Sequence, residues 1–197
     1  MNFLRAFAWL ACSIYATIPC FWLLIHPFAE TWRQRRGSRY RILLPAWVGM
    51  WMIAAALTRP WRESLIQETL IHSSLLGLLA GLPLIAAGIF LYSASRQDFS
   101  AAQLGGRPEI EARPGEQRLI TSGIRQRVRH PIYLGHLLEM LGWTFASGTW
   151  ATVILTAFAV VTGAWMIRME EAELERRFGD SYRRYCQRVP AIFPAVF

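Results

Sequence analysis

Long apolar runs without a charged residue alternate along this chain with segments that are rich in arginine. Three such runs cover residues 6–29, 42–58 and 69–95 and are 24, 17 and 27 residues long. A helix of about 20 apolar residues is long enough to cross the hydrocarbon core of a bilayer, which is about 30 Å thick. Each of the three runs is therefore predicted to form one membrane-spanning helix.

A fourth run, residues 130–167, is 38 residues long and contains one charged residue, Glu139. As a single helix it would measure about 57 Å, almost twice the thickness of the bilayer core. The chain must therefore turn within this run, and the turn-forming residues are Ser147-Gly148-Thr149. We predict two helices, 131–146 and 150–167, in a tight helical hairpin. The predicted fold is all-α, a polytopic integral membrane protein with five transmembrane helices.

The arginines are divided unequally between the segments that separate these runs. Segments 30–41, 96–129 and 168–188 contain five, seven and six of them, which is 18 of the 21 basic residues in the chain. Cytoplasmic loops of membrane proteins carry an excess of basic residues. We therefore expect these three segments and the C-terminus in the cytoplasm, and the N-terminus outside.

Composition narrows the possible functions. Hydrophobic residues make up 54% of the chain and charged residues 17%, which excludes disordered and disulfide-rich classes. All 21 basic residues are arginines, so a lysine Schiff base and a Walker phosphate loop are excluded. The net charge is +8, and the arginines lie beside apolar runs. We therefore expect them to interact with the head groups of anionic lipids and not with nucleic acid. Three scattered cysteines predict neither a disulfide framework nor a zinc site.

Two polar segments flank the predicted hairpin, the loop 96–129 and the tail 170–197. We treat residues 1–197 as one membrane domain, in which 1–95 supply three spans and 96–197 supply the catalytic part with a cofactor loop and a C-terminal helix. Polar groups in a helical membrane protein must face a cavity, because polar backbone is not left exposed to lipid. We therefore predict a cavity at the cytoplasmic mouth of the hairpin.

Spaced motifs around this cavity carry a resemblance to a known family. They are Arg-His-Pro-x-Tyr-x-Gly at 129–135, Glu-Glu-x-x-Leu at 170–174, Phe-Gly-Asp-x-Tyr-x-x-Tyr at 178–185 and Val-Pro at 189–190. Together they resemble the isoprenylcysteine carboxyl methyltransferase family, whose broader relatives include the phospholipid N-methyltransferases. The similarity covers residues 115–195, and the first three spans resemble the family only in number and hydrophobicity.

The resemblance implies an integral-membrane methyltransferase that uses S-adenosylmethionine and releases S-adenosylhomocysteine. The cofactor would lie in a pocket closed by the loop and the tail, and a lipophilic small molecule or lipid would enter sideways between helices as the acceptor. We expect a monomer among membrane lipids, without a metal ion. Carried over by position, the cofactor contacts are expected from Gln117, Arg118, Leu119, Ile120, Arg125, His130, Pro131, Ile132, Tyr133 and Glu170.

The chain departs from the family pattern at three positions. Gln117 stands where members often have His, and Arg125 stands where they often have Tyr. Met166 occupies the position, four residues before Glu170, at which the carboxyl methyltransferases place an arginine that faces the substrate. Arg168 lies two residues further on, about 200° around the helix, so it is not an obvious replacement. This departure argues against a carboxylate as the methyl acceptor.

His136 and Glu139 are three residues apart and share one face of the fourth predicted span. A glutamate inside a membrane is costly, and it is a functional candidate for that reason. We name Glu139 and Arg168 as the catalytic candidates, and Glu139 either contacts the acceptor or pairs with a buried arginine. The neighbouring charges are expected on a solvated face of the last helix: Glu171, Glu173 and Glu175, paired with Arg176 and Arg177.

Two hypotheses about function follow. The first is a methyltransferase for a lipophilic or small membrane-soluble acceptor that carries an amine, a thiol or a carboxylate. The alternative is a non-catalytic membrane protein that binds lipid or takes part in assembly on the same scaffold. A further motif, Gly77-x-x-x-Gly81, predicts close packing of two helices within the monomer.

Overall fold

The computed structural model describes residues 2–28, 40–70, 75–96 and 118–193, and these ranges are almost entirely helical. Within them, the extended pairing consists of one isolated bridge between Thr69 and Thr149. The elements in chain order are α1 (Asn2–Ile25), the 3₁₀ turn η1 (His26–Phe28), α3 (Tyr40–Gln67), α4 (Leu75–Ser95), the 3₁₀ turn η2 (Gly123–Gln126), α7 (Pro131–Ser147), α8 (Trp150–Phe178) and α9 (Asp180–Arg188).

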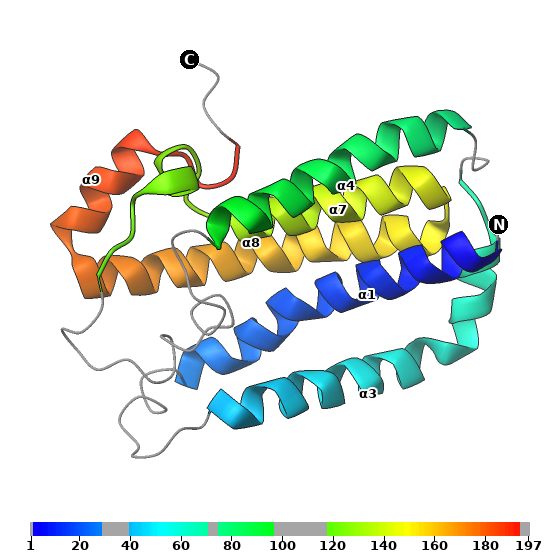
Figure 1. Cartoon of the computed structure of the whole chain (residues 1–197). Helices are drawn as coiled ribbons and strands as arrows, with labels where there is room; N and C mark the ends of the chain where they lie inside the picture. Colours follow the sequence, from blue (N-terminus) through cyan, green and yellow to red (C-terminus); the bar gives the residue numbers. More distant parts are fainter. Residues whose placement is uncertain (1, 29–39, 71–74, 97–117, 194–197) are drawn as a thin grey trace.

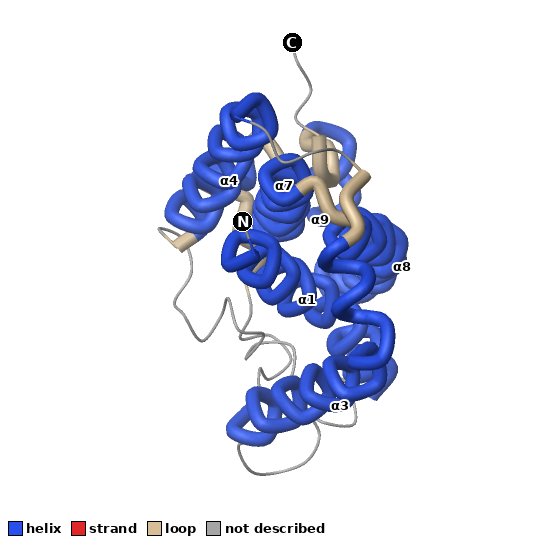
Figure 2. Tube along the Cα trace, turned by 90° about the vertical axis from the view of Figure 1, so that its right-hand side faces the viewer, coloured by secondary structure: helices blue, strands red, loops and turns tan. Residues whose placement is uncertain are grey.

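The five long helices lie side by side and successive ones run in opposite directions (Figure 1). At one end of the bundle lie the last turns of α1, α4 and α8, the first turns of α3 and α7, and the short helix α9. These are the helix ends that border the three arginine-rich segments. In the view of Figure 2, α3 lies at the edge of the bundle, where its contacts are with α1 and, less extensively, α8.

Four helices of the described residues are long and apolar enough to cross a membrane: Phe3–Phe28, Ile42–Gln67, Leu75–Ser95 and Trp150–Phe178. Their outward side chains are large and apolar, for example Leu44, Leu57 and Val161, which are 66%, 68% and 67% exposed. Such surfaces are expected to face lipid. The chain is therefore an integral membrane protein, and α7, with 17 residues, is not among these four helices.

Two helices extend further than the apolar runs predict. The charged residues that follow the second apolar run do not end the helix, because α3 continues through Pro60 to Gln67. Likewise α8 does not end near Ile167 and continues to Phe178, through six charged residues after Arg168. Arg and Glu are good helix formers, so a helix can leave the apolar layer without ending. What ends α8 is Gly179, whose φ of 53° suits glycine and few other residues.

Helices α4 and α7 approach each other so closely that their backbones touch. A Cβ placed on Gly142 would lie 2.6 Å from Ile85 and 2.7 Å from Gly81 O, and one on Gly77 would lie 2.5 Å from Phe145 O. Glycine at these positions removes the side chains that would keep the helices apart. The Gly77-x-x-x-Gly81 motif therefore serves packing within the monomer, and this prediction is confirmed.

The connection between α7 and α8 is short and well hydrogen-bonded. Gly148 ends α7 in the left-handed conformation with φ 64° and ψ 18°, and α8 begins at Trp150. Thr149 caps α8, because its hydroxyl accepts a hydrogen bond from Thr152 N–H at 3.4 Å. The turn is also tied to the segment after α3, since Leu70 N–H donates to Gly148 O at 2.8 Å.

Candidate active site

Backbone hydrogen bonds join the start of α7 to the C-terminal tail. Pro131 is the first residue of α7, as Pro often is. The two residues before it, Arg129 and His130, donate their backbone N–H groups to Pro190 O and Ala191 O, each at 2.9 Å. The tail is thereby fixed against the N-terminus of α7, where further N–H groups lack partners within the helix.

The guanidinium of Arg129 links the end of α8 to the same tail. Its Nε and Nη2 atoms donate to Glu171 Oε1 at 2.9 and 2.5 Å. Its Nη1 atom donates to Cys186 O at 3.3 Å and also to Val189 O. Burial lowers the pKa of Arg129, but the hydrogen bond and the charge of Glu171 outweigh burial, so this pKa lies above its ordinary value. Arg129 is therefore a fixed cation that connects three segments.

His130 lies between two adjacent glutamates of α8. Its Nε2 atom is 3.1 Å from Glu171 Oε1, and its Nδ1 atom is 3.7 Å from Glu170 Oε2. The His130 side chain is 4% exposed, whereas the Glu170 side chain is 27% exposed. Glu171 is engaged by both Arg129 and His130. The side chains of Glu170 and Glu171 are almost equally exposed, at 27% and 26%. In the part of the chain that the structure describes, Glu170 is the less engaged carboxylate and therefore has more capacity to bind a ligand.

Helix α9 packs its tyrosines against the loop that precedes α7. Tyr182, Tyr185 and Val189 form a buried cluster, with Leu119 packed against it. The hydroxyl of Tyr185 donates to Arg125 O at 2.7 Å. Burial raises the pKa of Tyr185 to about 12, so the hydroxyl stays protonated and keeps donating at neutral pH. These contacts hold residues 119–125 beside α9.

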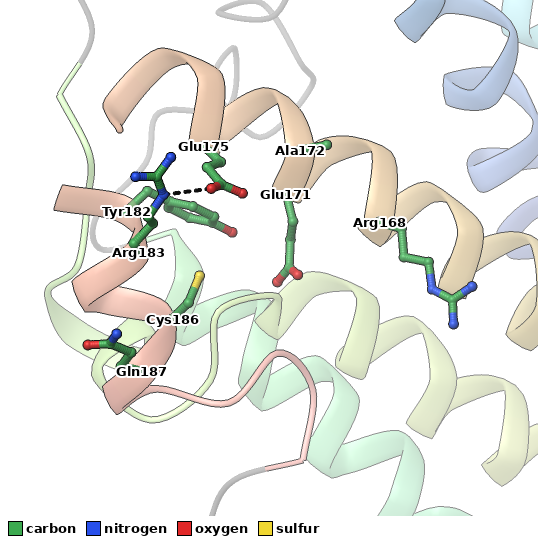
Figure 3. Close-up of a pocket in the computed structure, with 8 residues that line it drawn as sticks. All are labelled: Arg168, Glu171, Ala172, Glu175, Tyr182, Arg183, Cys186 and Gln187. Carbon is green, nitrogen blue, oxygen red and sulfur yellow. Dashed lines mark hydrogen bonds and ion pairs between the residues drawn. The ribbon is translucent and has the colours of Figure 1, made fainter. Parts of the chain in front are cut away.

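A surface pocket of about 480 Å³ lies between the end of α8 and α9 (Figure 3). This volume is within the usual range of small-molecule sites, about 300–1,000 Å³. Glu171 points into the pocket from α8, and Tyr182 and Cys186 face it from α9, while Arg168 lies further back along α8. The remaining lining residues are Ala172, Glu175, Arg183 and Gln187.

A second group of polar side chains lies between the helices, on α1, α4 and α7. The hydroxyl of Tyr15 donates to Glu139 Oε2 at 2.5 Å, and Glu139 is 5% exposed. The ring of His136 lies 4.9 Å from that of Tyr15 and 5.3 Å from that of Tyr92. The partner of Glu139 is thus a tyrosine. The prediction that an arginine might pair with it is not met among the described residues.

The structure brings some of the predicted site residues together and leaves others apart. Four of the predicted cofactor contacts, His130, Glu170, Leu119 and Arg125, come together at one end of the bundle. Among the other predicted cofactor contacts, Arg118 is exposed, Ile120, Ile132 and Tyr133 are half-buried, Pro131 is buried, and Gln117 lies outside the described residues. None of the nine predicted cofactor contacts that the structure describes lines the pocket between α8 and α9, whose lining includes Arg168.

The expected solvated face of α8 is partly wrong. Glu173 is 8% exposed, and its carboxylate lies 2.8 Å from His26 Nδ1 and 3.3 Å from Arg177 Nη1. Glu171 holds Arg129 and is not paired with Arg176 or Arg177. Glu175 is on the surface, but its partner is Arg183 of α9 at 2.7 Å. Sequence reasoning therefore missed Glu171 as a site residue.

Comparison with known proteins agrees with the resemblance. Residues 76–181, more than half of the chain, match the model of the family described as phospholipid methyltransferase. The chain belongs to that family. The region that matches the family begins in α4 and ends in α9, so it includes all of α7 and α8. Helices α1 and α3, and the tail residues that bind Arg129, lie outside it.

Curated relatives of this family member have different names. It is 37% identical over 81 residues to protein-S-isoprenylcysteine O-methyltransferase of Schizosaccharomyces pombe, which is 40% of this chain and 34% of the yeast protein. It is 40% identical over 74 residues to methanethiol S-methyltransferase 1 of Bradyrhizobium diazoefficiens, 34% of this chain and 23% of that protein. It is also 33% identical over 107 residues to a delta(14)-sterol reductase of Mus musculus. That match covers 52% of this chain and 25% of the reductase.

The matches thus span about a third or less of the length of these relatives. The resemblance to isoprenylcysteine carboxyl methyltransferases is confirmed, since two of the relatives carry that name. No solved structure matches this chain.

Proposed function

We propose that this chain is an integral-membrane methyltransferase that uses S-adenosylmethionine and acts on a lipophilic or small membrane-soluble acceptor. The observation that supports it best is the junction of Arg129 and His130 with the adjacent glutamates of α8 and with the tail. These are the separate motifs on which the family resemblance depends. They meet at one end of the bundle, where the predicted pocket would open to solvent.

The residues at this junction fit the cofactor. S-adenosylmethionine carries a carboxylate, an ammonium group and ribose hydroxyls, and when bound it supplies a methyl group on a sulfonium. Glu170, with a side chain 27% exposed, can accept hydrogen bonds from hydroxyl or ammonium groups. The N-terminus of α7 favours a carboxylate. Arg129 and Glu171, already bonded to each other, would orient His130 and close the tail over the cofactor.

Methyl transfer is an in-line displacement, so the protein has to hold donor and acceptor about 3–3.5 Å apart and exclude water. The carbon–sulfur bond breaks as the bond from the acceptor forms, and its electron pair goes to sulfur. No covalent nucleophile of the protein is needed. We place Glu139 and Arg168 on the acceptor side, with Glu139 between the helices and Arg168 at the surface pocket.

For the membrane arrangement, we propose five spans, with α7 and α8 as the terminal hairpin. Helix α7 has 17 residues, which gives a length of about 26 Å, close to the thickness of the bilayer core. Since 18 of 21 arginines fall in segments that border one end of the bundle, we place that end and the C-terminus in the cytoplasm and the N-terminus outside. The chain would act as one domain and as a monomer.

The decisive experiment is calorimetric titration of the detergent-purified protein with S-adenosylhomocysteine. We expect binding, and we expect His130→Ala and Glu170→Ala each to weaken it by about 1–3 kcal/mol through loss of charge-assisted hydrogen bonds. Glu63→Ala is the control, because Glu63 is an exposed glutamate of α3 that does not line the pocket between α8 and α9. Absence of binding in the wild type would refute the function and favour the non-catalytic alternative. Unchanged affinity in both variants would refute the site.

A further inference from the structure

The polar cluster between α1, α4 and α7 consists of Tyr15, Tyr92, Tyr133, His136 and Glu139, and we call it the aromatic–carboxylate cluster. His136 is at its centre: three tyrosine rings surround it, at 4.9, 5.3 and 6.4 Å between ring centroids. Glu139, one turn further along α7, accepts the hydrogen bond from Tyr15. Three helices thus contribute to one polar site inside an apolar bundle.

Two features of this cluster are not explained by packing alone. The Nδ1 atom of His136 is buried and has no hydrogen-bond partner among the described residues. A buried polar group without a partner costs free energy, so such a group calls for a ligand or a water molecule. In addition, Glu139 has room only because residue 88 is a glycine, since a Cβ there would lie 2.5 Å from Glu139 Cγ. The backbone of α4 therefore makes space for an expensive carboxylate.

The cluster begins beside the proposed cofactor site. The ring of Tyr133 lies 5.8 Å from that of His130, which contacts both Glu170 and Glu171. From His130 to Glu139 the helix rises by about 13.5 Å, at 1.5 Å per residue. An acceptor whose polar head lies at the cluster would enter from the membrane side and would meet a cofactor that extends from His130 along α7.

The chemistry of the cluster selects the head group. Its side chains offer one carboxylate and four aromatic rings, and in the described part of the chain no arginine forms an ion pair with Glu139. A cation is attracted to the faces of aromatic rings and to a carboxylate. A second carboxylate would meet Glu139 without a cation to offset it. Position 166, where the carboxyl methyltransferases place an arginine, is a buried methionine, and Arg168 is at the surface.

We propose that the aromatic–carboxylate cluster is the acceptor site and that the acceptor is a lipophilic amine. This inference rests on the proposed methyltransferase function and names its substrate class. The ammonium form of the amine pairs with Glu139, and one proton passes from nitrogen to a carboxylate oxygen. The neutral nitrogen then uses its lone pair to form the new bond to carbon, as the methyl–sulfur bond breaks and its electrons go to sulfur. Tyr15 is a positioning residue that holds the carboxylate in place.

The test is transfer of a radiolabelled methyl group from S-adenosylmethionine, with the protein in nanodiscs, to three acceptors that differ only in the head group: dodecylamine, dodecanoic acid and dodecanethiol. We expect methylation of the amine in preference to the other two. Glu139→Gln should lower turnover of the amine by about 100-fold or more, which is the usual contribution of a general base. Tyr15→Phe should lower kcat for the amine more than it changes KM. Glu63→Gln, at an exposed glutamate of α3 outside both proposed sites, should leave turnover unchanged.

Binding of S-adenosylhomocysteine, measured on the same preparations, tests the methyltransferase function separately from the choice of an amine as the acceptor. If the wild type binds it but methylates the acid or the thiol in preference to the amine, the inference is wrong and the methyltransferase function stands. The inference is also wrong if Glu139→Gln retains full amine turnover. If the wild type does not bind it, the proposed function fails first. Glu139→Gln should keep its affinity for S-adenosylhomocysteine, which shows that the variant is folded.

Discussion

We expect the hydrogen bonds between Arg129 and Glu171 to stabilise the packing of the C-terminal tail against the start of α7. Backbone N–H groups of Arg129 and His130 donate to Pro190 O and Ala191 O, so these two amides are protected from exchange with solvent only while the tail is in place. The Glu171 carboxylate supports this pairing indirectly, because it fixes the guanidinium that also binds Cys186 O and Val189 O. Weakening Glu171 should therefore speed up exchange at both amides.

The magnitude follows from the geometry for the variant Glu171→Gln. The amide oxygen of glutamine can still accept hydrogen bonds from Arg129, whose Nε and Nη2 now donate to Glu171 Oε1 at 2.9 and 2.5 Å. A neutral hydrogen bond contributes about 1 kcal/mol and one to a charged partner about twice as much, so two bonds would lose about 2 kcal/mol together. With Glu171 26% exposed, solvent reduces the loss, and we expect about 1.4 kcal/mol, which is tenfold in an opening equilibrium.

The assay is hydrogen–deuterium exchange, read by mass spectrometry on peptides that cover residues 127–133. At a pH where reclosing is faster than chemical exchange, the amides of Arg129 and His130 should exchange about tenfold faster in Glu171→Gln than in the wild type. Glu175→Gln is the matched control, because it removes a carboxylate from the same helix that binds exposed Arg183 and not the tail. Equal exchange in Glu171→Gln and the control would show that the arginine–glutamate bond does not hold the tail.

Two further predictions concern the membrane arrangement and the helix packing. The orientation can be tested with single cysteines in a background without Cys12, Cys20 and Cys186. An impermeant thiol reagent added outside intact cells should label a cysteine at exposed position 64 and should not label one at exposed position 184. The reverse pattern would overturn the orientation. Gly142→Ala should lower the free energy of unfolding by about 1–3 kcal/mol through overpacking, because its Cβ would lie 2.7 Å from Gly81 O, while Gly49→Ala, with open space around it, should not. Thermal unfolding of the three proteins in one detergent measures this difference.

Apolar runs predicted the helices well and their ends less well. A run without charges shows where lipid can cover a helix, but it does not show where the helix stops, because Arg and Glu also favour helix. Residues 59–67 and 168–178 lie outside the apolar runs for this reason, and both continue helices that begin in apolar segments. A better signal for the end of α8 was Gly179, the first residue after Arg168 that interrupts good helix formers.

The glutamates of α8 show a similar limit. Adjacent residues of a helix point about 100° apart, so a Glu-Glu pair does not reveal which member faces the loop. The predicted contact, Glu170, lies 3.7 Å from His130. Glu171 lies closer to His130, at 3.1 Å, and it also accepts a hydrogen bond from Arg129 at 2.9 Å. For Glu173 a signal did exist. The buried residues Thr156, Gly163 and Met166 are seven and three apart, and a further step of seven leads to Glu173 on the same face.

Tyr15 had no signal in the sequence at all, because its partner Glu139 is 124 residues away. Single polar residues inside apolar runs are nevertheless informative as a group. Each is costly in a membrane unless it meets another, so polar residues on packed helices are expected to meet. Tyr15, Tyr92, His136 and Glu139 do so. Helix α1, which lies outside the family match, thereby supplies a hydroxyl to the proposed acceptor site. On this proposal the first span would help to choose the acceptor, while the segments around Arg129 and Glu171 would hold the cofactor.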